Sequence, residues 1–451
     1  MLEDTICAPA TAPVNSSLSI IRISGPESYR AAYSLFSNRE KIAHRFAAYG
    51  SIVSGGEVID DVILLYYKGP SSFTGEDMVE IFCHGNPIVV SRIMKLFFAN
   101  GVRAAQPGEF SKRAFLNGKI DLTEAEAINS LINARSDWEI KRSLEQMHGS
   151  LAKTVNDIRE DVIMLKADLE AGIDFIDQDI EFVSYERGIE IAEAVNIKLS
   201  GFLKRCVTGE RVSRGVDVIL AGRPNVGKSS LLNLILNEER AIVSDIPGTT
   251  RDLIRETVQV GGIKINLTDT AGIASTDDDI EKIGIERTKR KIADASLVLA
   301  VIDGTAGITD EDKEILSSFK DKKIIYVLNK IDLISSEKAE ALKNETGFNF
   351  IPVSAKFGHG FGELEKAISE VISSEFVDYD NSFLADARIT GILSDSLIII
   401  ERVIELFGRK ELPEIIAFDL NELSDKLSEI TGEISPDDVL GSIFSRFCIG
   451  K

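Results

Sequence analysis

The chain has 451 residues, of which 44% are hydrophobic and 27% are charged, and its formal net charge is -21 at pH 7. This length is typical of several domains, and no apolar run reaches the roughly 20 residues that a membrane-spanning helix needs. Because nucleic-acid-binding surfaces are usually basic, the acidic charge argues against DNA binding and indicates that a partner supplies most contacts to any RNA. The four cysteines show no metal-ligand spacing, which favours reduced thiols in a cytoplasmic protein.

Residues 1–118 predict an α+β domain. Two stretches, at 18–25 and 58–69, are rich in β-branched residues and end in glycine, a pattern typical of strands. The segment NPIVVSRIMKLFFANG at 86–101 predicts a helix that ends at Gly101.

Two separated segments, 119–212 and 375–451, predict helices. Apolar residues from Ile140 to Leu169 repeat at steps of three and four, which indicates one continuous amphipathic helix. Further helices of this kind are expected at 187–208, 393–407 and 416–430. Because amphipathic helices need a partner surface, we expect the two segments to form one all-helical domain that is split in sequence. Two separate helical domains are the alternative.

Between these segments, residues 213–374 alternate short apolar runs with polar loops and helical stretches. This alternation predicts an inserted α/β domain with a mostly parallel, doubly wound sheet and helices on both faces. Domain termini usually lie close together, which permits such an insertion. The runs expected to form strands lie at 216–222, 265–272, 296–304, 324–330 and 350–355.

The segment GRPNVGKSS at 222–230 matches the P-loop pattern G-x-x-x-x-G-K-[ST], follows an expected strand and precedes an apolar run. In such a loop, backbone N–H groups and the following helix N-terminus bind phosphates. Lys228 would reach the β- and γ-phosphates of a nucleotide, and Ser229 would bind Mg²⁺. Taken alone, the pattern is also compatible with a glycine-rich turn.

Three further motifs follow in order and favour GTP. In NKID, at 329–332, the carboxylate of Asp332 can accept two hydrogen bonds from the guanine edge, a pair of donors that adenine lacks. The segment SAK at 354–356 would support the base, and DTAG at 269–272 would sense the γ-phosphate. Chance does not explain the presence of all these motifs in this order, so we interpret the segment as a GTP-binding domain.

The segment PGTTRD at 247–252 would form switch I, in which Thr250 completes the Mg²⁺ shell of the GTP state. The set resembles the translation-factor-related GTPases. The expected GTP-binding residues are Asn225, Val226, Gly227, Lys228, Ser229, Ser230, Ser244, Asp245, Ile246, Pro247, Gly248, Thr249, Thr250, Asp269, Thr270, Ala271, Gly272, Asn329, Lys330, Asp332, Ser354, Ala355 and Lys356.

Three other stretches are more specific: GEDMVEIFCHGNP at 75–87, QPGEFSKRAFLNGKIDLTEAEA at 106–127 and FSRFCIGK at 444–451. With the order of the domains, they resemble the tRNA modification GTPases of the MnmE (TrmE) family along the whole chain. The resemblance implies a K⁺-dependent GTP hydrolase, a homodimer that works with an FAD-containing partner in a heterotetramer. Together they would add a carboxymethylaminomethyl or aminomethyl group at C5 of the wobble uridine (U34) of certain tRNAs.

The residue after DTAG is Ile273, whose aliphatic side chain cannot orient the attacking water as the glutamine of Ras-like proteins does. The resemblance implies that Glu281 takes this role through a bridging water, with Lys228 as the second catalytic residue. It also implies that K⁺ replaces an arginine finger by stabilising charge on the transferred phosphoryl group. The K⁺ ligands that it implies are Asn225, Ser244, Ile246 and Thr249. Without the resemblance, Asn225 fits a turn and Glu281 a solvated acidic face.

The resemblance further implies a folate-binding-like N-terminal domain that also dimerises. A tetrahydrofolate derivative, of the 5-formyl or 5,10-methylene type, would supply the one-carbon unit. The matching positions are Arg22, Glu80, Lys119 and Lys451. A carboxylate such as Glu80 can bind the amide-like donors of a pterin, and the anionic glutamate tail suits Arg22 or Lys119. Cys448 is either a tail thiol that faces this chemistry or a small packing residue.

Two rival functions stay open at this point. In the first, the chain is a GTP-driven conformational switch or interaction protein without chemistry of its own on tRNA. In the second, it is a free-standing folate-dependent transferase with a regulatory GTPase. An assay of the purified protein alone on tRNA separates the two, because product formed without the partner supports the transferase.

Overall fold

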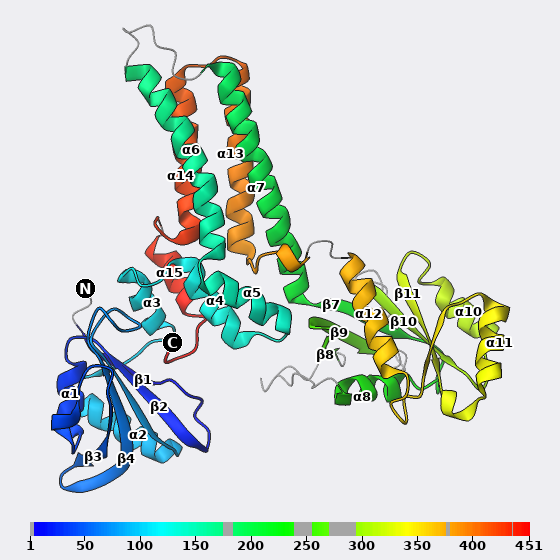
Figure 1. Ribbon diagram of the computed structural model, residues 1–451, viewed down its shortest axis with the longest axis horizontal. Helices are drawn as coiled ribbons and strands as arrows, with labels where there is room; N and C mark the ends of the chain where they lie inside the picture. Colours follow the sequence, from blue (N-terminus) through cyan, green and yellow to red (C-terminus); the bar gives the residue numbers. More distant parts are fainter. Residues whose placement is uncertain (1–3, 175–183, 239–254, 270–294, 376–378, 435) are drawn as a thin grey trace, which may run out of the picture. The chain divides into compact units, whose positions relative to one another are not determined.

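The computed structural model describes residues 4–174, 184–238, 255–269, 295–375, 379–434 and 436–451 (Figure 1). The chain divides into two compact units. Unit 1 comprises Met1–Ile132, Leu144–Lys198 and Ile392–Lys451, and unit 2 comprises Asn133–Ser143 and Leu199–Gly391. The expected four-segment division, with boundaries at 118, 212 and 374, stays a prediction.

Unit 1 contains a six-stranded sheet in the order β3-β4-β5-β2-β1-β6. Neighbouring strands pair antiparallel, except that β1 and β6 are parallel. The strands are β1 Ile6–Pro9, β2 Ser16–Ser24, β3 Ala47–Ser54, β4 Glu57–Tyr67, β5 Met78–Gly85 and β6 Arg103–Ala104. Helices α1 Ser28–Leu35 and α2 Pro87–Ala99 pack on the sheet around a core that includes Phe36, Ile81 and Phe97. The two strands and the helix expected in this region are confirmed.

Three shorter helices of unit 1 lie next to its C-terminal tail: α3 Glu109–Leu116, α4 Leu122–Asn133 and α15 Asp437–Phe444. A small apolar core between them contains Leu122, Leu440, Phe444 and Phe447. A backbone hydrogen bond attaches the tail to α3, since the N–H of Phe110 donates to the carbonyl of Lys451 at 3.2 Å. Gly450 has φ +90, and a Cβ there would lie 2.2 Å from the carbonyl oxygen of Pro9. Only glycine therefore fits this close approach.

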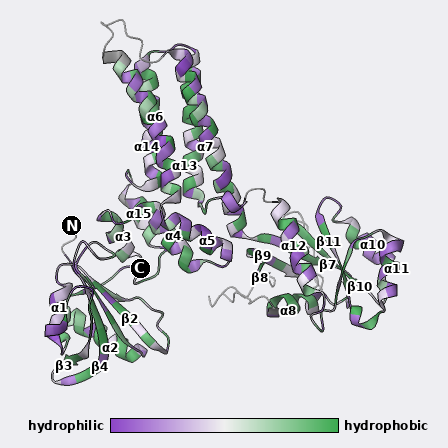
Figure 2. Ribbon diagram, viewed as in Figure 1, coloured by the Kyte–Doolittle hydropathy of each residue, from purple (hydrophilic) through white to green (hydrophobic). Residues whose placement is uncertain are grey.

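The longer helices follow the expected apolar stripes. They are α5 Asp137–Met147, α6 Ser150–Asp174, α7 Tyr185–Arg214, α13 Ala387–Gly408 and α14 Pro413–Thr431. Helix α6 packs against α14, and Tyr185 of α7 contacts Phe407 of α13 with ring centroids 6.4 Å apart. In Figure 2, hydrophobic and hydrophilic residues alternate along these helices, as they do in amphipathic helices.

The prediction of one continuous helix from Ile140 to Leu169 is wrong, because the helix is interrupted between the end of α5 at Met147 and the start of α6 at Ser150. Gly149 adopts φ +79, the left-handed conformation that commonly ends helices, and its N–H donates to the carbonyl of Gln146 at 2.9 Å. Ile140 and Leu144, before the break, have exposed fractions of 40% and 42%. A spacing of three and four residues continues across this break, so periodicity alone does not detect it.

Unit 2 contains a six-stranded sheet in the order β12-β11-β10-β7-β9-β8. The expected strands are confirmed and parallel, and they are β7 Val216–Ala221, β9 Ile263–Asp269, β10 Leu297–Asp303, β11 Lys323–Asn329 and β12 Phe350–Val353. Strand β8 Arg255–Val260 was not expected and pairs antiparallel with β9 at the edge.

The sheet of unit 2 is covered on both faces. Val218 and Leu220 of β7 enter one apolar core, whereas Ile219 and Ala221 enter another. Because successive side chains of a strand point to opposite faces, the two cores lie on opposite sides of the sheet, as in doubly wound folds. Among the described residues between 216 and 375, the α-helices are α8 Lys228–Glu238, α10 Asp310–Ser317, α11 Ser336–Thr346 and α12 Phe361–Glu375.

The four cysteines are free, which agrees with the expected reduced thiols. Burial raises the pKa of Cys7 to about 12, of Cys83 to about 11 and of Cys206 to about 12. Cys448, in contrast, is exposed. Among the helices that the structure describes, none combines the length and the apolar character needed to cross a membrane.

Two glycines of α7 provide a matched test of packing in unit 2. In Gly209→Ala the new Cβ would lie 1.8 Å from the carbonyl oxygen of Phe383, whereas nothing lies within 4 Å of a Cβ at Gly201. We expect Gly209→Ala to lower the free energy of unfolding by about 1–3 kcal/mol through overpacking. Gly201→Ala should raise it by about 0.5–1 kcal/mol, because alanine favours a helix.

Urea denaturation measures both changes through the fluorescence of Trp138, the single tryptophan, which is buried in unit 2. Equal stability of the two alanine variants would contradict the close packing of Gly209.

Candidate functional site

The P-loop connects β7 to α8, and close contacts require its glycines. Gly227 has φ +99, and a Cβ there would lie 2.2 Å from Nδ2 of Asn329. Gly222 has φ +151, and a Cβ there would lie 2.4 Å from the carbonyl oxygen of Val301. A side chain at either position would force the loop away from β10 and β11.

Lys228, the first residue of α8, is buried, and the P-loop itself holds its ammonium group. Its Nζ donates to the carbonyl oxygens of Gly222 at 2.7 Å and of Arg223 at 2.9 Å. Ser229 and Ser230 follow at the exposed start of the helix, where the backbone N–H groups and the helix dipole favour anions. Phosphates bound at this helix N-terminus would therefore lie beside a positive charge that is already in place.

Asn329 joins the P-loop to the loop after β12. Its side chain is 2% exposed, its Nδ2 donates to the carbonyl of Val226 at 2.9 Å, and its Oδ1 accepts from the N–H of Ala355 at 3.0 Å. A buried polar group that loses its partner costs about 1–3 kcal/mol. The amide of Asn329 thus holds three expected nucleotide motifs in one fixed arrangement.

Two charged residues that follow Asn329 are also positioned by neighbouring motifs. The hydroxyl of Ser354 donates to Oδ1 of Asp332 at 2.6 Å, which orients the carboxylate expected to bind guanine. Lys330 donates from Nζ to the carbonyl of Asn225 at 2.8 Å and to Oδ2 of Asp303 at 2.6 Å. Burial alone would raise the pKa of Asp303, but the hydrogen bond from Lys330 helps to hold it below its usual value. Lys330 is therefore tied to both the P-loop and β10.

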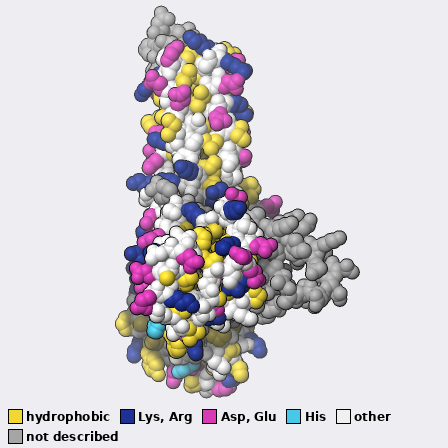
Figure 3. Space-filling view, turned by 90° about the vertical axis from the view of Figure 1, so that its right-hand side faces the viewer, with side chains coloured by type: hydrophobic (Ala, Val, Ile, Leu, Met, Phe, Trp, Pro, Cys, Tyr) yellow, Lys and Arg dark blue, Asp and Glu magenta, His cyan; other side chains and the backbone are white. Residues whose placement is uncertain are grey.

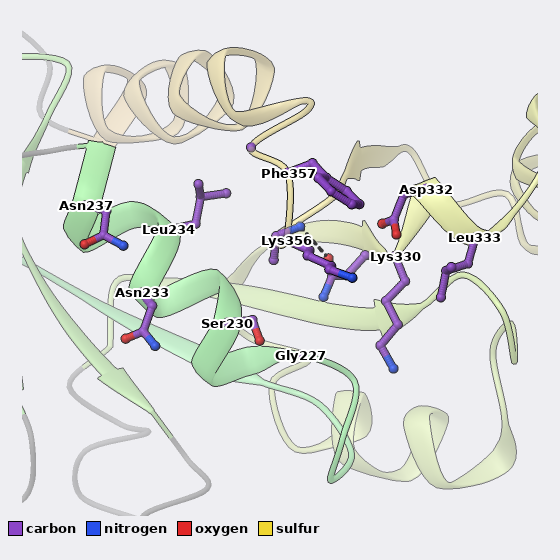
Figure 4. Close-up of a pocket in the computed structure, with 13 residues that line it drawn as sticks. Gly227, Ser230, Asn233, Leu234, Asn237, Lys330, Asp332, Leu333, Lys356 and Phe357 are labelled. Carbon is purple, nitrogen blue, oxygen red and sulfur yellow. Dashed lines mark hydrogen bonds between the residues drawn. The ribbon is translucent and has the colours of Figure 1, made fainter.

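These loops surround a cavity of about 820 Å³ (Figure 4). The expected residues that line it are Gly227, Ser230, Asn329, Lys330, Asp332, Ala355 and Lys356. The lining residues that were not expected are Asn233, Leu234, Asn237, Leu333, Phe357 and Gly358. In Figure 4, Lys356, Phe357 and Asp332 lie on neighbouring loops across from Ser230 and Asn233 of α8. The α8 residues lie at helical spacing after Ser230, a signal that would have found them.

The other expected GTP-binding residues are placed only in part. Asn225, Val226 and Ser354 belong to the loops around this cavity, and Lys228 and Ser229 begin α8, but none of the five lines it. Asp269 is the last residue of β9. Outside the described residues lie Ser244, Asp245, Ile246, Pro247, Gly248, Thr249, Thr250, Thr270, Ala271, Gly272 and the catalytic candidate Glu281.

A second cavity, of about 690 Å³, lies in unit 1. It brings together the four expected folate residues, which are Arg22, Glu80, Lys119 and Lys451. The register of β2 and β5 places Arg22 opposite Glu80, and Nε of Arg22 donates to Oε1 of Glu80 at 2.7 Å. The hydroxyl of Tyr67 donates to Oε2 of the same carboxylate at 3.4 Å. The ion pair thus follows directly from the pairing of two strands.

The C-terminal tail reaches this second cavity through Lys451. Nη1 of Arg22 donates to the carbonyl of Gly450 at 3.3 Å. Burial, and to a smaller extent the neighbouring charge of Arg22, lowers the pKa of Lys451. Cys448 is exposed and is not one of the lining residues, although its carbonyl accepts from the N–H of Gly108 at 3.3 Å.

The other lining residues of the second cavity were not expected from the sequence, and they are Arg45, Tyr67, Pro70, Ser71, Ser72, Phe73, Met78, Ile128 and Met147. Tyr67 ends an expected strand, and the guanidinium of Arg22 lies 5.9 Å from the centre of the Phe73 ring. Arg45 lies in the loop before β3, outside every expected element, so no sequence signal marks it.

Comparisons with known proteins cover the whole chain. The family model described as GTP-binding protein TrmE N-terminus matches residues 5–119, and the one described as MnmE helical domain matches residues 122–448. The tRNA modification GTPase MnmE of Aquifex aeolicus is 43% identical over 452 residues, which is 100% of this chain and 100% of that protein. The protein of the same name from Thermotoga maritima is 40% identical over 451 residues, which is 99% of this chain and 100% of that protein. Because these matches extend over the full length of both proteins, the chain belongs to the MnmE (TrmE) family.

Proposed function

We propose that this protein binds and hydrolyses GTP as one component of a tRNA-modifying assembly. The proposal that it binds GTP rests mainly on the cavity of about 820 Å³, where the side chain of Asn329 forms hydrogen bonds with both the P-loop and the loop of Ala355. In it, the carboxylate of Asp332 would select guanine, and the ammonium of Lys228 would bind the phosphates. The full-length relatives are tRNA modification GTPases by name, which supports the same function.

Hydrolysis would use charge that the P-loop already holds. Lys228 would exchange its carbonyl partners for the β- and γ-phosphates and stabilise the charge that develops on them. The hydroxyls of Ser229 and Thr250 would bind Mg²⁺, whose preferred ligands are oxygens. Glu281 would orient the attacking water.

The proposed K⁺ site depends on Asn225. This residue has φ +65 and an exposed side chain, and Nζ of Lys330 donates to its backbone carbonyl at 2.8 Å, so the backbone of the loop is fixed while the side-chain amide is open to solvent. Its oxygen is a suitable ligand for a hard cation. Ser244, Ile246 and Thr249 would complete the site, and the bound cation would offset negative charge on the transferred phosphoryl group.

The second cavity supports the rest of the proposal. Four residues from distant parts of the sequence meet there, and a carboxylate among basic side chains suits a ligand with donors at one end and carboxylates at the other. A tetrahydrofolate derivative has this chemistry and would supply the one-carbon unit. With an FAD-containing partner, a cytoplasmic homodimer of this chain would then modify C5 of U34 with a carboxymethylaminomethyl or aminomethyl group.

The surface charge is consistent with a partner that makes most of the tRNA contacts. On the face in Figure 3, the Lys and Arg side chains of the described residues are interspersed with Asp and Glu and form no single large basic area. The formal net charge of the chain is -21. Such a surface attracts a phosphate backbone only weakly.

Mass spectrometry of wobble uridines from cells that lack this protein tests the proposed function. Loss of the C5 modification is the expected result, and unchanged modification would contradict it. Assays of the purified chain on tRNA, with and without the FAD-containing partner, separate the rival functions. Product formed by the chain alone would identify a free-standing transferase, and GTP hydrolysis with no effect on tRNA in either assay would identify a switch.

Exchange of one carboxylate tests the guanine site. Asp332→Asn replaces a hydrogen-bond acceptor by a donor, so it should weaken GTP binding and favour xanthosine triphosphate, whose C2 carbonyl is an acceptor. Since a hydrogen bond to a charged group contributes about 1.5–3 kcal/mol, GTP affinity should fall roughly 10- to 100-fold. Titration with a fluorescent GTP analogue measures this, and Asp310→Asn, on the exposed start of α10, is the matched control. An unchanged GTP affinity in Asp332→Asn would show that guanine is bound elsewhere.

The identity of the salt cation tests the proposed K⁺ site. Phosphate release should be roughly 10²-fold faster in K⁺ than in Na⁺ at equal ionic strength, because the smaller Na⁺ would be poorly coordinated by ligands spaced for K⁺. Asn225→Lys places an ammonium at the same position and should hydrolyse GTP with little response to the salt. Nucleotide affinity, measured in parallel, should stay similar, since the interaction forms mainly in the transition state. Equal turnover of the unmodified protein in the two salts rules this site out.

A further inference from the structure

The lining of the cavity in unit 1 has an excess of positive charge. Its basic lining residues are Arg22, Arg45, Lys119 and Lys451, and Glu80 is the acidic side chain in the lining. Because Glu80 pairs with Arg22 at 2.7 Å, the lining offers no second carboxylate to balance the other three cations. This excess favours a ligand with more than one negative charge.

The backbone of Arg45 is in a costly conformation. Its φ is +58, in the left-handed region that residues with a Cβ rarely adopt. Two backbone hydrogen bonds impose this turn, from the N–H of Arg45 to the carbonyl of Tyr66 at 2.8 Å and from Phe46 to Ala43 at 3.1 Å. Glycine or asparagine would suit the turn better. Such residues cluster at ligand sites, where the side chain has a role that stability alone does not explain.

The side chain of Arg45 is exposed at the edge of the cavity and makes weak contacts there. Its Nη2 donates to the carbonyl of Ser71, another lining residue, at 3.4 Å. Tyr67 lines the same cavity, where burial raises its pKa and the charges of Arg22 and Arg45 oppose this rise. The structure gives Arg45 no ion pair with any described carboxylate, and its fork of donors is therefore available to a ligand.

We propose that Arg45 recognises the anionic tail of the ligand, so that this cavity distinguishes folates that carry glutamate from the same ring system without it. The inference rests on the proposed folate function and assigns the tail to Arg45 rather than to Arg22, which Glu80 already engages. The Arg22–Glu80 pair binds the ring end of the ligand. Arg45 forms two parallel hydrogen bonds with a tail carboxylate, the geometry for which a guanidinium is suited.

Titration of the full chain with three probes tests this assignment. The probes are 5-formyltetrahydrofolate, its triglutamate, and 5-formyltetrahydropteroate, which lacks glutamate. The unmodified protein should bind both glutamylated probes more tightly than the pteroate. Arg45→Asn keeps a residue that tolerates the left-handed turn and should bind the glutamylated probes roughly 10-fold more weakly, because a charge-assisted pair is lost. Its affinity for the pteroate should not change.

Two further variants and a melting temperature distinguish recognition of the glutamate tail by Arg45 from a general effect of charge and from a loss of folding. Arg30→Gln removes one positive charge from an exposed position of α1 outside the cavity, and it should leave all three affinities unchanged. Arg45→Lys keeps the charge but loses the paired donors, so its affinity for the glutamylated probes should lie between those of the unmodified protein and Arg45→Asn. The melting temperature of Arg45→Asn should equal or exceed that of the unmodified protein, since the backbone strain is relieved.

The outcomes distinguish failure of this inference from failure of the folate function. If the unmodified protein binds the pteroate and the glutamylated probes equally, the role of Arg45 is overturned while folate binding stands. The role is also overturned if Arg45→Asn weakens all three probes alike, because this would indicate a structural effect. If the unmodified protein binds none of the probes, the folate function itself is contradicted.

Discussion

The nucleotide site of this protein depends on one buried amide. Because Asn329 donates to Val226 and accepts from Ala355, the P-loop and the two loops beside the base have a fixed relation before any ligand binds. The same amide accounts for Gly227, since a Cβ there would collide with its Nδ2. A preformed site of this kind avoids the ordering cost that flexible loops would add to binding. The P-loop also supplies temporary partners for the ammonium of Lys228, so the charge is present without being left unsatisfied.

The cavity of unit 1 is assembled on a different principle. Its residues come from two paired strands, from loops and from the C-terminal tail, and the register of β2 and β5 is what brings Arg22 and Glu80 together. The tail is positioned by its backbone and by the close approach of Gly450 to Pro9. Changes in tail packing will therefore alter the cavity by displacing Lys451, whereas the loops of the nucleotide site are fixed by their local hydrogen bonds.

Apolar runs predicted the parallel strands of unit 2 correctly, because strands buried on both faces are nearly continuous hydrophobic segments. Strand β8 was missed because RETVQV, at the edge, mixes charged and apolar residues. The break at Gly149 was missed because the helical spacing continues across it. Arg22 and Glu80 could be carried over from the family resemblance, but Arg45 could not be found, since its loop takes its shape from a contact with Tyr66 that is distant in sequence.

The distribution of the cysteines makes this protein suitable for site-specific labelling without substitutions. The thiolate is the reactive form of cysteine, and burial keeps Cys7, Cys83 and Cys206 protonated and shielded, with pKa values of about 12, 11 and 12. Cys448 is exposed and lies in the same tail as Lys451, which lines the cavity of unit 1. A maleimide dye will therefore attach at a single native position, in the tail that also contributes Lys451 to the cavity.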